Sequence, residues 1–558
     1  MKRPVIAIGL DAAEPALVEA WMEAGYLPNL CRLKARGSYC RVKNLDYYRA
    51  ETPWTTFLTG CKPTRTGYWA PIQFHPDSYD AELVEAYDFK DYPPFYALGD
   101  EYRVAIFDMP HARLADNVNG LQILAWGAHS PQGPSTSSPG SLFNEIVKEY
   151  GPHPGLHNDH ASCFDLEAQN RLEGILKTGI ERRVKISHDL LAREDWDLFL
   201  TVFGETHAAG HFMWHLGQKN HPLYGTLGEG VDDKMLAVFQ AVDQAVAEIV
   251  EKAPEDANIL VFSAHGMDTN VMDLPSMFFL AEFLYRWNFP GKYGLAKSDM
   301  SKPVGSIVTR CKKKSWLWEV WSSRHDLNPL RRFLRRQAPY RVFKKLAPLF
   351  GGQDSGDLIS PFELREQKYG LFFQAASWYQ PSWHKMKAFA LPSFSEGYIR
   401  INLKGREAQG IVEPSEYDRV CEEITQQLHQ LKDARTGIAM VDKVIRTRQS
   451  PEDNSSTLPD ADLVVIWQAH QATDAVESPT IGRIGPVPHF RSGSHRSEGF
   501  LIANGPEVEA GVELPVAHAL DLTTTILEMM AAPIPDYFDG KSIFRTPVSQ
   551  AGSSSSAK

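Results

Sequence analysis

Val5-Ile-Ala-Ile-Gly-Leu10 is an uninterrupted apolar run with Asp11 directly after it, close to the start of a chain of 558 residues. A short run that is apolar at every position is typical of a strand buried on both faces of a parallel sheet. The same pattern returns at residues 102–108, 196–203 and 258–263, and helical stretches lie between these runs. This alternation predicts an α/β fold with a mainly parallel sheet, and a functional site at the carboxyl ends of its strands.

The composition is that of a globular protein, with 43% hydrophobic and 23% charged residues, which excludes wholesale disorder and collagen-like fibres. A net charge of −11 makes the chain a poor candidate for non-specific nucleic-acid binding. Its six cysteines are scattered without a CxxC pair, which indicates reduced thiols. No apolar stretch reaches the roughly eighteen residues of a transmembrane helix. We therefore expect a cytoplasmic protein that binds no specific nucleic acid; the oligomeric state stays open.

The middle of the chain breaks the alternation. Residues 302–345 are rich in Lys and Arg, interleaved with Trp316, Trp318 and Trp321. Three interpretations remain: a solvated amphipathic insert whose aromatic residues pack on the main body, a basic cap over an anionic substrate, or a helix on a membrane surface. The predicted organisation is a catalytic core of residues 1–269 and 411–545, a cap of residues 270–410, and a disordered tail of residues 546–558.

Two histidines, His207 and His211, follow the predicted strand at 196–203 in the sequence Gly-Glu-Thr-His-Ala-Ala-Gly-His. On a helical turn this spacing puts both imidazoles on one face, which suits the binding of one divalent metal. Further candidate ligands follow predicted strands or lie in a polar loop: Asp11, His265 and His495. One aspartate and four histidines at such positions are improbable as satisfied core groups.

With these segments in view, the chain resembles the alkaline phosphatase superfamily, in its type I phosphodiesterase/nucleotide pyrophosphatase branch. The resemblance implies an alkaline phosphatase-like three-layer sandwich with an inserted cap. It also implies a metal-dependent hydrolase acting on a phosphate ester or diphosphate in a small anionic molecule, with a site for two metals, usually zinc. The matching segments run in family order: residues 8–15, 25–30, 54–60, 204–211, 263–267, 493–506 and 521–527.

Residue by residue, the resemblance makes ligands of Asp11, His211, His265 and His495. His207 stands where the family usually has Asp, and Ala264 stands where a second-site Asp is expected. Three imidazoles, those of His207, His211 and His495, form a set that can hold one zinc and leave a position open for water. The second site retains Asp11 and His265, and we expect it to be empty or weak unless Glu51, Glu205 or Asp268 fills it. One tightly bound zinc is therefore the prediction.

The family's nucleophile position is occupied by Ala50. Thr52 is the nearest hydroxyl, and it is a candidate for a covalent role; its other interpretation is the N-cap of a helix that starts at Pro53. A metal-activated water is the alternative nucleophile, with Asp11, Glu51 or Glu205 as general base.

Three functional hypotheses follow. The first is a metal-dependent hydrolase of the phosphodiesterase/pyrophosphatase type. The second is a group transferase or lyase on the same fold, because the nucleophile region is altered. The third is a non-catalytic binding protein that kept the fold after losing a carboxylate at position 264 and a hydroxyl at position 50. The set of histidines weighs against the third hypothesis. Substrate identity is beyond the sequence, since fold analogy cannot supply it.

Overall fold

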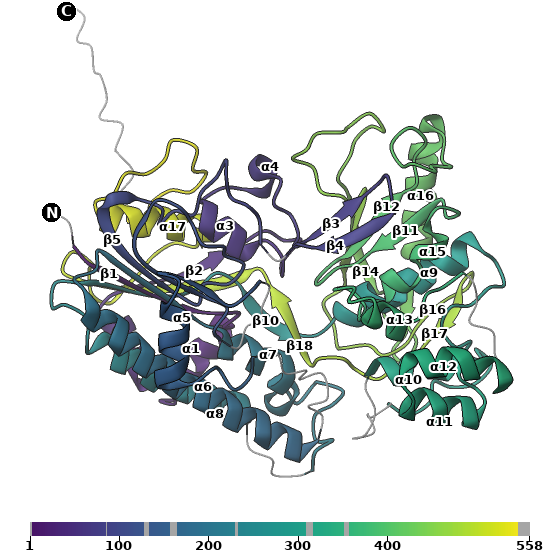
Figure 1. Ribbon diagram of the computed structural model, residues 1–558, viewed down its shortest axis with the longest axis horizontal. Coiled ribbons are helices and arrows are strands. Elements are labelled where there is room, and N and C mark those ends of the chain that lie inside the picture. Colours follow the sequence, from purple (N-terminus) through teal and green to yellow (C-terminus); the bar gives the residue numbers. More distant parts are fainter. Residues whose placement is uncertain are drawn as a thin grey trace, which may run out of the picture.

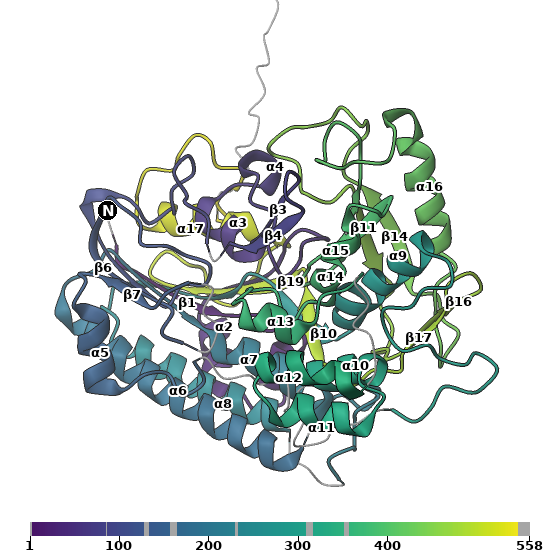
Figure 2. The ribbon, with the colours of Figure 1, turned by 45° about the vertical axis from the view of Figure 1, so that its right-hand side comes forward.

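The computed structural model describes residues 3–84, 86–127, 133–156, 165–228, 233–307, 316–350 and 357–544. The chain forms two lobes that lie side by side, the first on a large sheet and the second on a smaller one (Figures 1 and 2). The predicted disordered tail, residues 546–558, lies outside the described residues. Among the residues that are described, no helix has both the length and the apolar character needed to cross a membrane.

The central sheet has the strand order β20-β2-β19-β9-β1-β8-β5-β6-β7, with β21 also beside β2. Strand β1 lies between β8 and β9 and is parallel to both, and β5 and β6 continue the parallel part, whereas β19 and β7 are antiparallel to their neighbours. The predicted α/β fold with a mainly parallel sheet is thus confirmed. The strands are β1 (Val5–Leu10), β2 (Ser38–Lys43), β5 (Gly99–Phe107), β6 (Val118–Leu124), β7 (Thr136–Ser138), β8 (Leu198–Phe203), β9 (Asn258–Ser263), β19 (Glu498–Asn504), β20 (Val512–Glu513) and β21 (Ala517–His518).

Helices cover both faces of this sheet, as a strand that is apolar at every position requires. In β1, the side chains of Ile6, Ile8 and Leu10 lie in one hydrophobic core, and those of Val5 and Ala7 lie in the other. Figure 1 shows α6 and α8 below the sheet and α3 and α17 above it. The helices of the first lobe are α1 (Pro15–Glu23), α2 (Pro28–Ala35), α3 (Pro53–Thr59), α4 (Pro63–Thr66), α5 (Leu142–Tyr150), α6 (Leu166–Arg193), α7 (Gly204–Gly217), α8 (Lys234–Val250) and α17 (Ala519–Met529).

The second lobe has its own hydrophobic core around an antiparallel sheet of order β11-β12-β15-β14. This lobe extends beyond residue 410, where the cap was expected to end, because β12 pairs with β15 through Tyr398 and Val464. A boundary at 410 would separate these partners. The strands are β11 (Ala388–Leu391), β12 (Gly397–Ile401), β13 (Lys432–Asp433), β14 (Val441–Arg446), β15 (Leu463–Trp467), β16 (Val476–Ser478) and β17 (Gly482–Ile484).

Short helices surround the second sheet, several of them clustered at the lower edge of the lobe (Figure 2). Two tryptophans of the basic segment, Trp316 and Trp321, are buried in the core of this lobe. The helical elements are η1 (Pro275–Phe279), α9 (Leu280–Asn288), α10 (Trp316–His325), α11 (Pro329–Gln337), α12 (Tyr340–Leu346), η2 (Ala347–Phe350), α13 (Pro361–Glu366), α14 (Ala375–Trp378), α15 (Gln380–Trp383), η3 (Pro414–Glu416) and α16 (Tyr417–Leu428).

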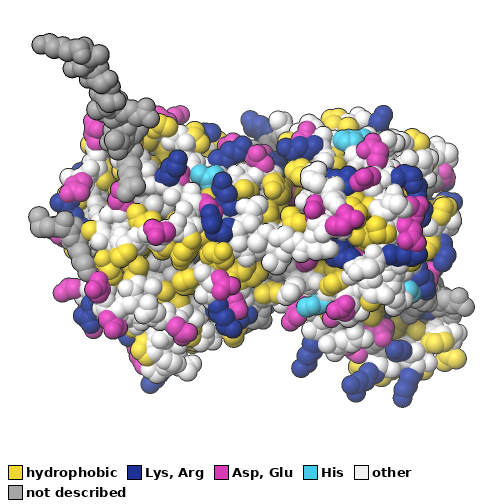
Figure 3. Space-filling model, turned by 90° about the horizontal axis from the view of Figure 1, so that it is seen from above, with side chains coloured by type: hydrophobic (Ala, Val, Ile, Leu, Met, Phe, Trp, Pro, Cys, Tyr) yellow, Lys and Arg dark blue, Asp and Glu magenta, His cyan; other side chains and the backbone are white. Residues whose placement is uncertain are grey.

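A β-hairpin from the first 85 residues, β3 (Ile72–His75) and β4 (Asp80–Leu83), packs into the core of the second lobe. The Tyr79 hydroxyl donates to Oδ1 of Asn402 over 2.6 Å, and the Phe74 amide donates to a carboxylate oxygen of Asp460 over 2.9 Å. The hairpin therefore joins the two lobes. Seen from above, the lobes meet over a broad waist, and basic and acidic side chains are interspersed on this face (Figure 3).

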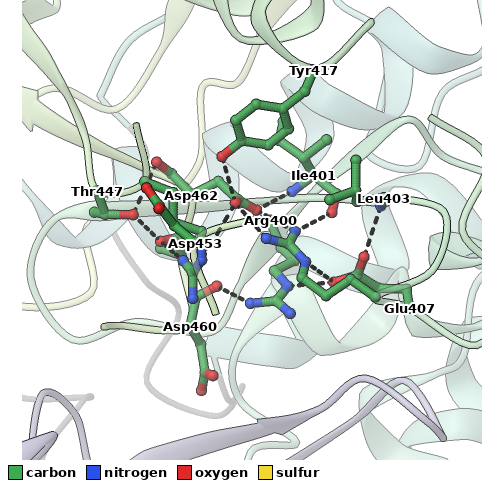
Figure 4. A network of polar contacts seen from close by, with 12 residues as sticks. Arg400, Ile401, Leu403, Glu407, Tyr417, Thr447, Asp453, Asp460 and Asp462 are labelled. Carbon is green, nitrogen blue, oxygen red and sulfur yellow. Dashed lines mark hydrogen bonds and ion pairs between the residues drawn. The ribbon is translucent and has the colours of Figure 1, made fainter. Parts of the chain in front are cut away.

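A buried ionic network stabilises the second lobe near β12 and β15 (Figure 4). Asp462 accepts two hydrogen bonds from the Arg406 guanidinium, each of 2.7 Å, and one from the Tyr417 hydroxyl of 2.8 Å. Although burial raises the pKa of this carboxyl, the Arg406 guanidinium lowers it more, to about 2. Arg400 in turn pairs with Glu407 at 2.6 Å. The network ties the strand ends to the loop after β12.

Candidate active site

The carboxyl ends of β1, β8 and β9 bring three of the predicted site residues to one edge of the sheet. Because β1 and β8 are parallel and paired through Leu10 and Phe203, Asp11 lies beside the start of α7. The Asp11 amide donates to the Phe203 carbonyl over 3.1 Å. His265 follows the end of β9, the other neighbour of β1.

Helix α7 carries His207 and His211 one turn apart, as the spacing predicted. The third imidazole comes from β18 (Gly493–Arg496), which pairs antiparallel with β10 (Gly266–Thr269). This short ribbon is held against the helix because the Ser492 amide donates to the His211 carbonyl over 2.8 Å. His495 therefore reaches the same point from a strand almost 300 residues further along the chain.

The three histidines form a cluster with the geometry of a metal site. Their candidate ligand nitrogens lie within 4.8 Å of one another, and Nε2 of His207 is 3.1 Å from Nε2 of His211. Two imidazole nitrogens on one tetrahedral zinc, each about 2.0–2.1 Å from the ion, would be roughly 3.3 Å apart. His211 and His495 are buried and His207 is partly exposed. The donor set and its spacing fit zinc.

Hydrogen bonds fix the tautomer of His211. Its Nδ1 lies 2.8 Å from the Gly493 carbonyl, so Nδ1 carries the proton and donates. Nη1 of Arg491 lies 3.0 Å from Nε2 of the same ring, and a guanidinium can only donate. Nε2 of His211 therefore presents a lone pair, as a metal ligand must, and the Gly493 carbonyl orients the ring from behind.

Arg491 is a site residue that the sequence analysis missed. Its Nε donates to Asp273 over 2.7 Å, which directs the guanidinium towards His211. Asp273 is itself buried and also accepts a hydrogen bond from the Ser494 hydroxyl at 3.0 Å. A guanidinium held in this way beside a histidine cluster can bind an anionic oxygen. In the sequence, only its position four residues before the predicted ligand His495 indicated that Arg491 could belong to the site.

The residues of the second predicted site lie next to the first. The ring centroids of His265 and His495 are 4.9 Å apart, and Nε2 of His265 is 3.7 Å from Oδ1 of Asp11. The same oxygen of Asp11 accepts a hydrogen bond from the Trp54 indole at 2.9 Å. Ala264 is buried, and its methyl side chain supplies no ligand atom. The structure thus gathers all five predicted ligands; their binding of metal stays a prediction.

The sequence model of the type I phosphodiesterase/nucleotide pyrophosphatase family matches residues 5–314. That span is more than half of the chain and includes β1, α7 and β9. The chain belongs to this family. No curated protein matches it.

Two solved structures are similar to this chain in fold. Phosphonoacetate hydrolase from Sinorhizobium meliloti, in complex with phosphonoformate, is 15% identical, with 95% of this chain and 96% of that chain covered and a TM-score of 0.45. Murine ectonucleotide pyrophosphatase/phosphodiesterase 5 is 12% identical, with 96% of each chain covered and a TM-score of 0.45. Similarity at this level does not extend to substrate or mechanism.

In this member of the phosphodiesterase family, Thr52 is the N-cap residue of α3 and is fully buried. Its hydroxyl donates to the Tyr48 carbonyl over 2.9 Å, and its own carbonyl accepts from the hydroxyls of Thr55 and Thr56. The structure therefore gives the Thr52 hydroxyl a partner within its own turn. The position suits the interpretation as a helix cap, although the side chain does not cap the helix amides.

Glu51 was predicted as a general base and lies in a buried cluster with the second lobe. Its carboxylate accepts hydrogen bonds from the Phe394 amide at 3.0 Å, the Ser395 hydroxyl at 2.5 Å and the Tyr398 hydroxyl at 2.9 Å. Burial, and then the nearby Glu396 carboxylate, raise the pKa of Glu51 to about 7. These contacts join the loop before α3 to β12 and its preceding turn.

Glu205, the other glutamate predicted as a base, is fully buried at the first turn of α7. Its carboxylate lies 3.3 Å from Nε of Arg183 and 3.2 Å from Nε2 of His153. Burial raises the pKa of Glu205, but the Arg183 guanidinium and His153 together outweigh this effect, and the pKa is lowered. Arg183 also pairs with Asp108 at 2.6 Å. Of the three carboxylates predicted as bases, Asp11 is the one that lies beside the histidines.

Proposed function

We propose that this family member is a zinc-dependent hydrolase that cleaves a phosphate ester or diphosphate bond in a small anionic molecule, with water rather than a side-chain hydroxyl as the nucleophile. The observation that carries the proposal is the convergence of His207, His211 and His495, whose candidate ligand nitrogens lie within 4.8 Å of one another. Nε2 of His207 and Nε2 of His211 are 3.1 Å apart. Zinc held by these three rings would act as a Lewis acid and lower the pKa of a water near it.

The chain's own residues supply the other functions of the site. The Arg491 guanidinium, held by Asp273, binds an anionic oxygen of the substrate and directs it towards the histidines. The Asp11 carboxylate takes the proton from the attacking water, and His265 lies 3.7 Å from it. The Trp54 indole fixes the carboxylate's orientation through its 2.9 Å hydrogen bond.

We expect one equivalent of zinc in protein washed with a chelator, because Ala264 and Ala50 leave the second site with Asp11 and His265. Metal analysis by mass spectrometry tests this number. Two equivalents would show that another residue completes the second site. No bound metal would sink the hydrolase proposal and favour a non-catalytic binding protein.

A product screen tests the reaction. Bis-p-nitrophenyl phosphate, p-nitrophenyl phosphate and p-nitrophenyl sulfate separate phosphodiesterase, phosphomonoesterase and sulfatase activity. Assays with an added alcohol acceptor then distinguish hydrolysis from group transfer, because transfer would give an alkyl phosphate in place of inorganic phosphate or the monoester. Metal-loaded protein that hydrolyses none of these esters would contradict the proposal.

The cytoplasm is the compartment that we propose. Cysteines 31, 40, 61 and 421 are free thiols, and burial raises the pKa of those at positions 40, 61 and 421 to about 12. Unpaired thiols of this kind suit a reducing compartment. Fractionation of the native host would test this placement.

A further inference from the structure

Helices α11 and α12 and the turn η2 belong to a segment with an unusual charge. Residues 327–350 contain seven Lys and Arg residues and no Asp or Glu, in a chain whose net charge is −11. Blocks of like charge repel one another and often bind an oppositely charged partner. The segment's own structure shows where that charge lies.

Two of the seven cations point inward. Arg331 and Arg335 are buried, and both pair with Asp326, Arg331 at 3.0 Å. The Arg335 guanidinium also lies over the ring of Phe343, 4.0 Å from its centroid. Asp326 and Phe343 thus hold α11 against α12 and offset the charge on this inner side. The two buried arginines therefore have their partners inside the second lobe.

The outer side of the same segment is apolar. In α11, Leu330 and Phe333 are spaced three residues apart and are 61% and 63% exposed. In α12, Val342 and Leu346 are spaced four apart and both are exposed. Helical residues three or four apart share one face. The exposed apolar residues of the segment are Leu327, Leu330, Phe333, Val342, Leu346 and Leu349.

Cations flank these apolar residues. Arg336 follows Phe333 by three positions on α11, and Arg341 and Lys345 lie one position before Val342 and Leu346 on α12; all three are exposed. We call these three cations, together with the six exposed apolar residues, the basic–apolar face. Single exposed apolar residues are ordinary, but here six large ones fall within 23 residues of the described chain. A grouping of this kind indicates a surface that binds something.

The basic–apolar face lies at the periphery of the molecule. Helices α11 and α12 and the turn η2 contact one another, and the Asn328 side chain donates to the Phe350 carbonyl over 2.8 Å, which closes the unit. Figures 1 and 2 both show α11 at the lower edge of the second lobe, with α12 beside it. The helical unit therefore lies at the outer edge of the second lobe.

We propose that the basic–apolar face docks the protein on an anionic lipid membrane. Short helices with exposed apolar side chains beside Lys and Arg bind in the plane of a bilayer interface, with the apolar groups at the acyl boundary and the cations at acidic headgroups. Each cation near such a surface strengthens binding, and salt weakens it. The proposal does not depend on the proposed hydrolase activity. The cations of the basic–apolar face would attract the negatively charged membrane although the protein as a whole is acidic.

The test is co-sedimentation of the full-length protein with vesicles. Vesicles of phosphatidylcholine containing about one third phosphatidylglycerol should bind the protein, and pure phosphatidylcholine vesicles should not. Raising the salt to about 0.5 M should weaken the binding. Two double variants probe the face: Phe333→Ser with Leu346→Ser, and Arg336→Glu with Lys345→Glu. Each should weaken binding by about tenfold or more.

Two control variants make the same kinds of change away from the basic–apolar face. Val516→Ser removes an apolar residue that is 70% exposed elsewhere, and Lys185→Glu with Lys252→Glu makes the same change of net charge on exposed positions of the first lobe; both should bind as the wild type does. Equal melting temperatures establish that the variants fold. Equal binding to the two vesicle types, or unchanged binding by both face variants, would overturn the proposal. So would self-association that the Phe333→Ser, Leu346→Ser variant abolishes, in the absence of vesicle binding, since the occupant would then be a second copy.

Discussion

Nη1 of Arg491 donates a hydrogen bond to Nε2 of His211 over 3.0 Å. This is the nitrogen that would bind a metal ion. The contact puts a fixed positive charge next to the histidine cluster, and Asp273 holds that charge in place. When a cation binds the histidines, the guanidinium must turn away from Nε2 and towards the substrate. In the proposed function, Arg491 is therefore the residue expected to recognise the negative charge of the substrate.

Replacing Arg491 with Ala should raise KM by about ten- to a hundredfold for an anionic ester, because a charge-assisted contact worth about 1.5–3 kcal/mol is lost. Asp273→Asn should have a smaller effect of the same sign, since it only loosens the guanidinium. Steady-state kinetics on metal-loaded protein measure both. Zinc content should stay at the wild-type value, and a loss of zinc in either variant would assign Arg491 to the metal site instead.

His211→Ala should remove zinc and activity together, because two imidazoles are fewer than the three protein ligands that a catalytic zinc site needs. Metal content by mass spectrometry and ester hydrolysis are measured on the same preparation. His75→Ala, on a partly exposed strand of the hairpin, is the control and should retain both. Full zinc content in His211→Ala would remove this histidine from the ligand set.

Thr52→Ala should keep activity within about tenfold of the wild type, because the buried hydroxyl donates to the Tyr48 carbonyl and water is the proposed nucleophile. The cost should appear in stability, at about 1 kcal/mol for one lost hydrogen bond. Chemical denaturation and initial rates are the two measurements. A fall in kcat of a thousandfold or more with intact zinc would instead make Thr52 a covalent nucleophile.

Glu205→Gln should destabilise the protein by about 3–5 kcal/mol, because it removes the carboxylate that offsets the buried Arg183 charge. Its activity per folded molecule should change little, since the carboxylate faces Arg183 and His153. Urea unfolding gives the first quantity and active-site-normalised rates give the second. Wild-type stability combined with lost activity would restore Glu205 as the general base.

Stability should also fall in mild acid. Burial lowers the pKa of three histidines from the usual 6.5: to about 4 for His215, about 3 for His221 and about 4 for His489. The unfolded chain therefore binds protons first, so this stability is complete above pH 6.5 and decreases as the pH falls towards 4. Each histidine contributes up to about 1.4 kcal/mol per pH unit. Unfolding at several pH values should give a shallower slope for His489→Gln, and a flat wild-type profile would contradict the assignment.

The fold of the first lobe could be predicted because its strands are apolar at every position. The run at 5–10 is β1, and the run at 258–263 is β9, with bounds that agree to the residue. The extent of the second lobe was harder, since β12 and β15 pair across about 60 residues and nothing local marks which sheet a strand joins. The strand pattern at 462–467 predicts that β15 is a strand and does not identify its neighbours.

In the candidate site, too, contacts between residues close in the sequence could be predicted and contacts between distant residues could not. The spacing of His207 and His211 predicts their shared face because helix geometry alone decides it. The partners of Glu51 and Arg491 lie 343 and 218 residues away in the chain. The sequence does not show whether a carboxylate is exposed to water or paired with a buried arginine. The assignment of general bases therefore needed the three-dimensional contacts.

The hairpin of β3 and β4 has a consequence for how the chain is made. The hydrogen-bond acceptor of Tyr79 is Asn402, which is synthesised 323 residues later. At roughly 5–20 residues per second on the ribosome, that interval is on the order of 20 to 60 s. During it the apolar side chains of Ile72 and Phe74 have no finished core to enter. The hairpin therefore cannot complete its packing until the second lobe has emerged, and we expect the nascent chain to bind chaperones that shield it until then.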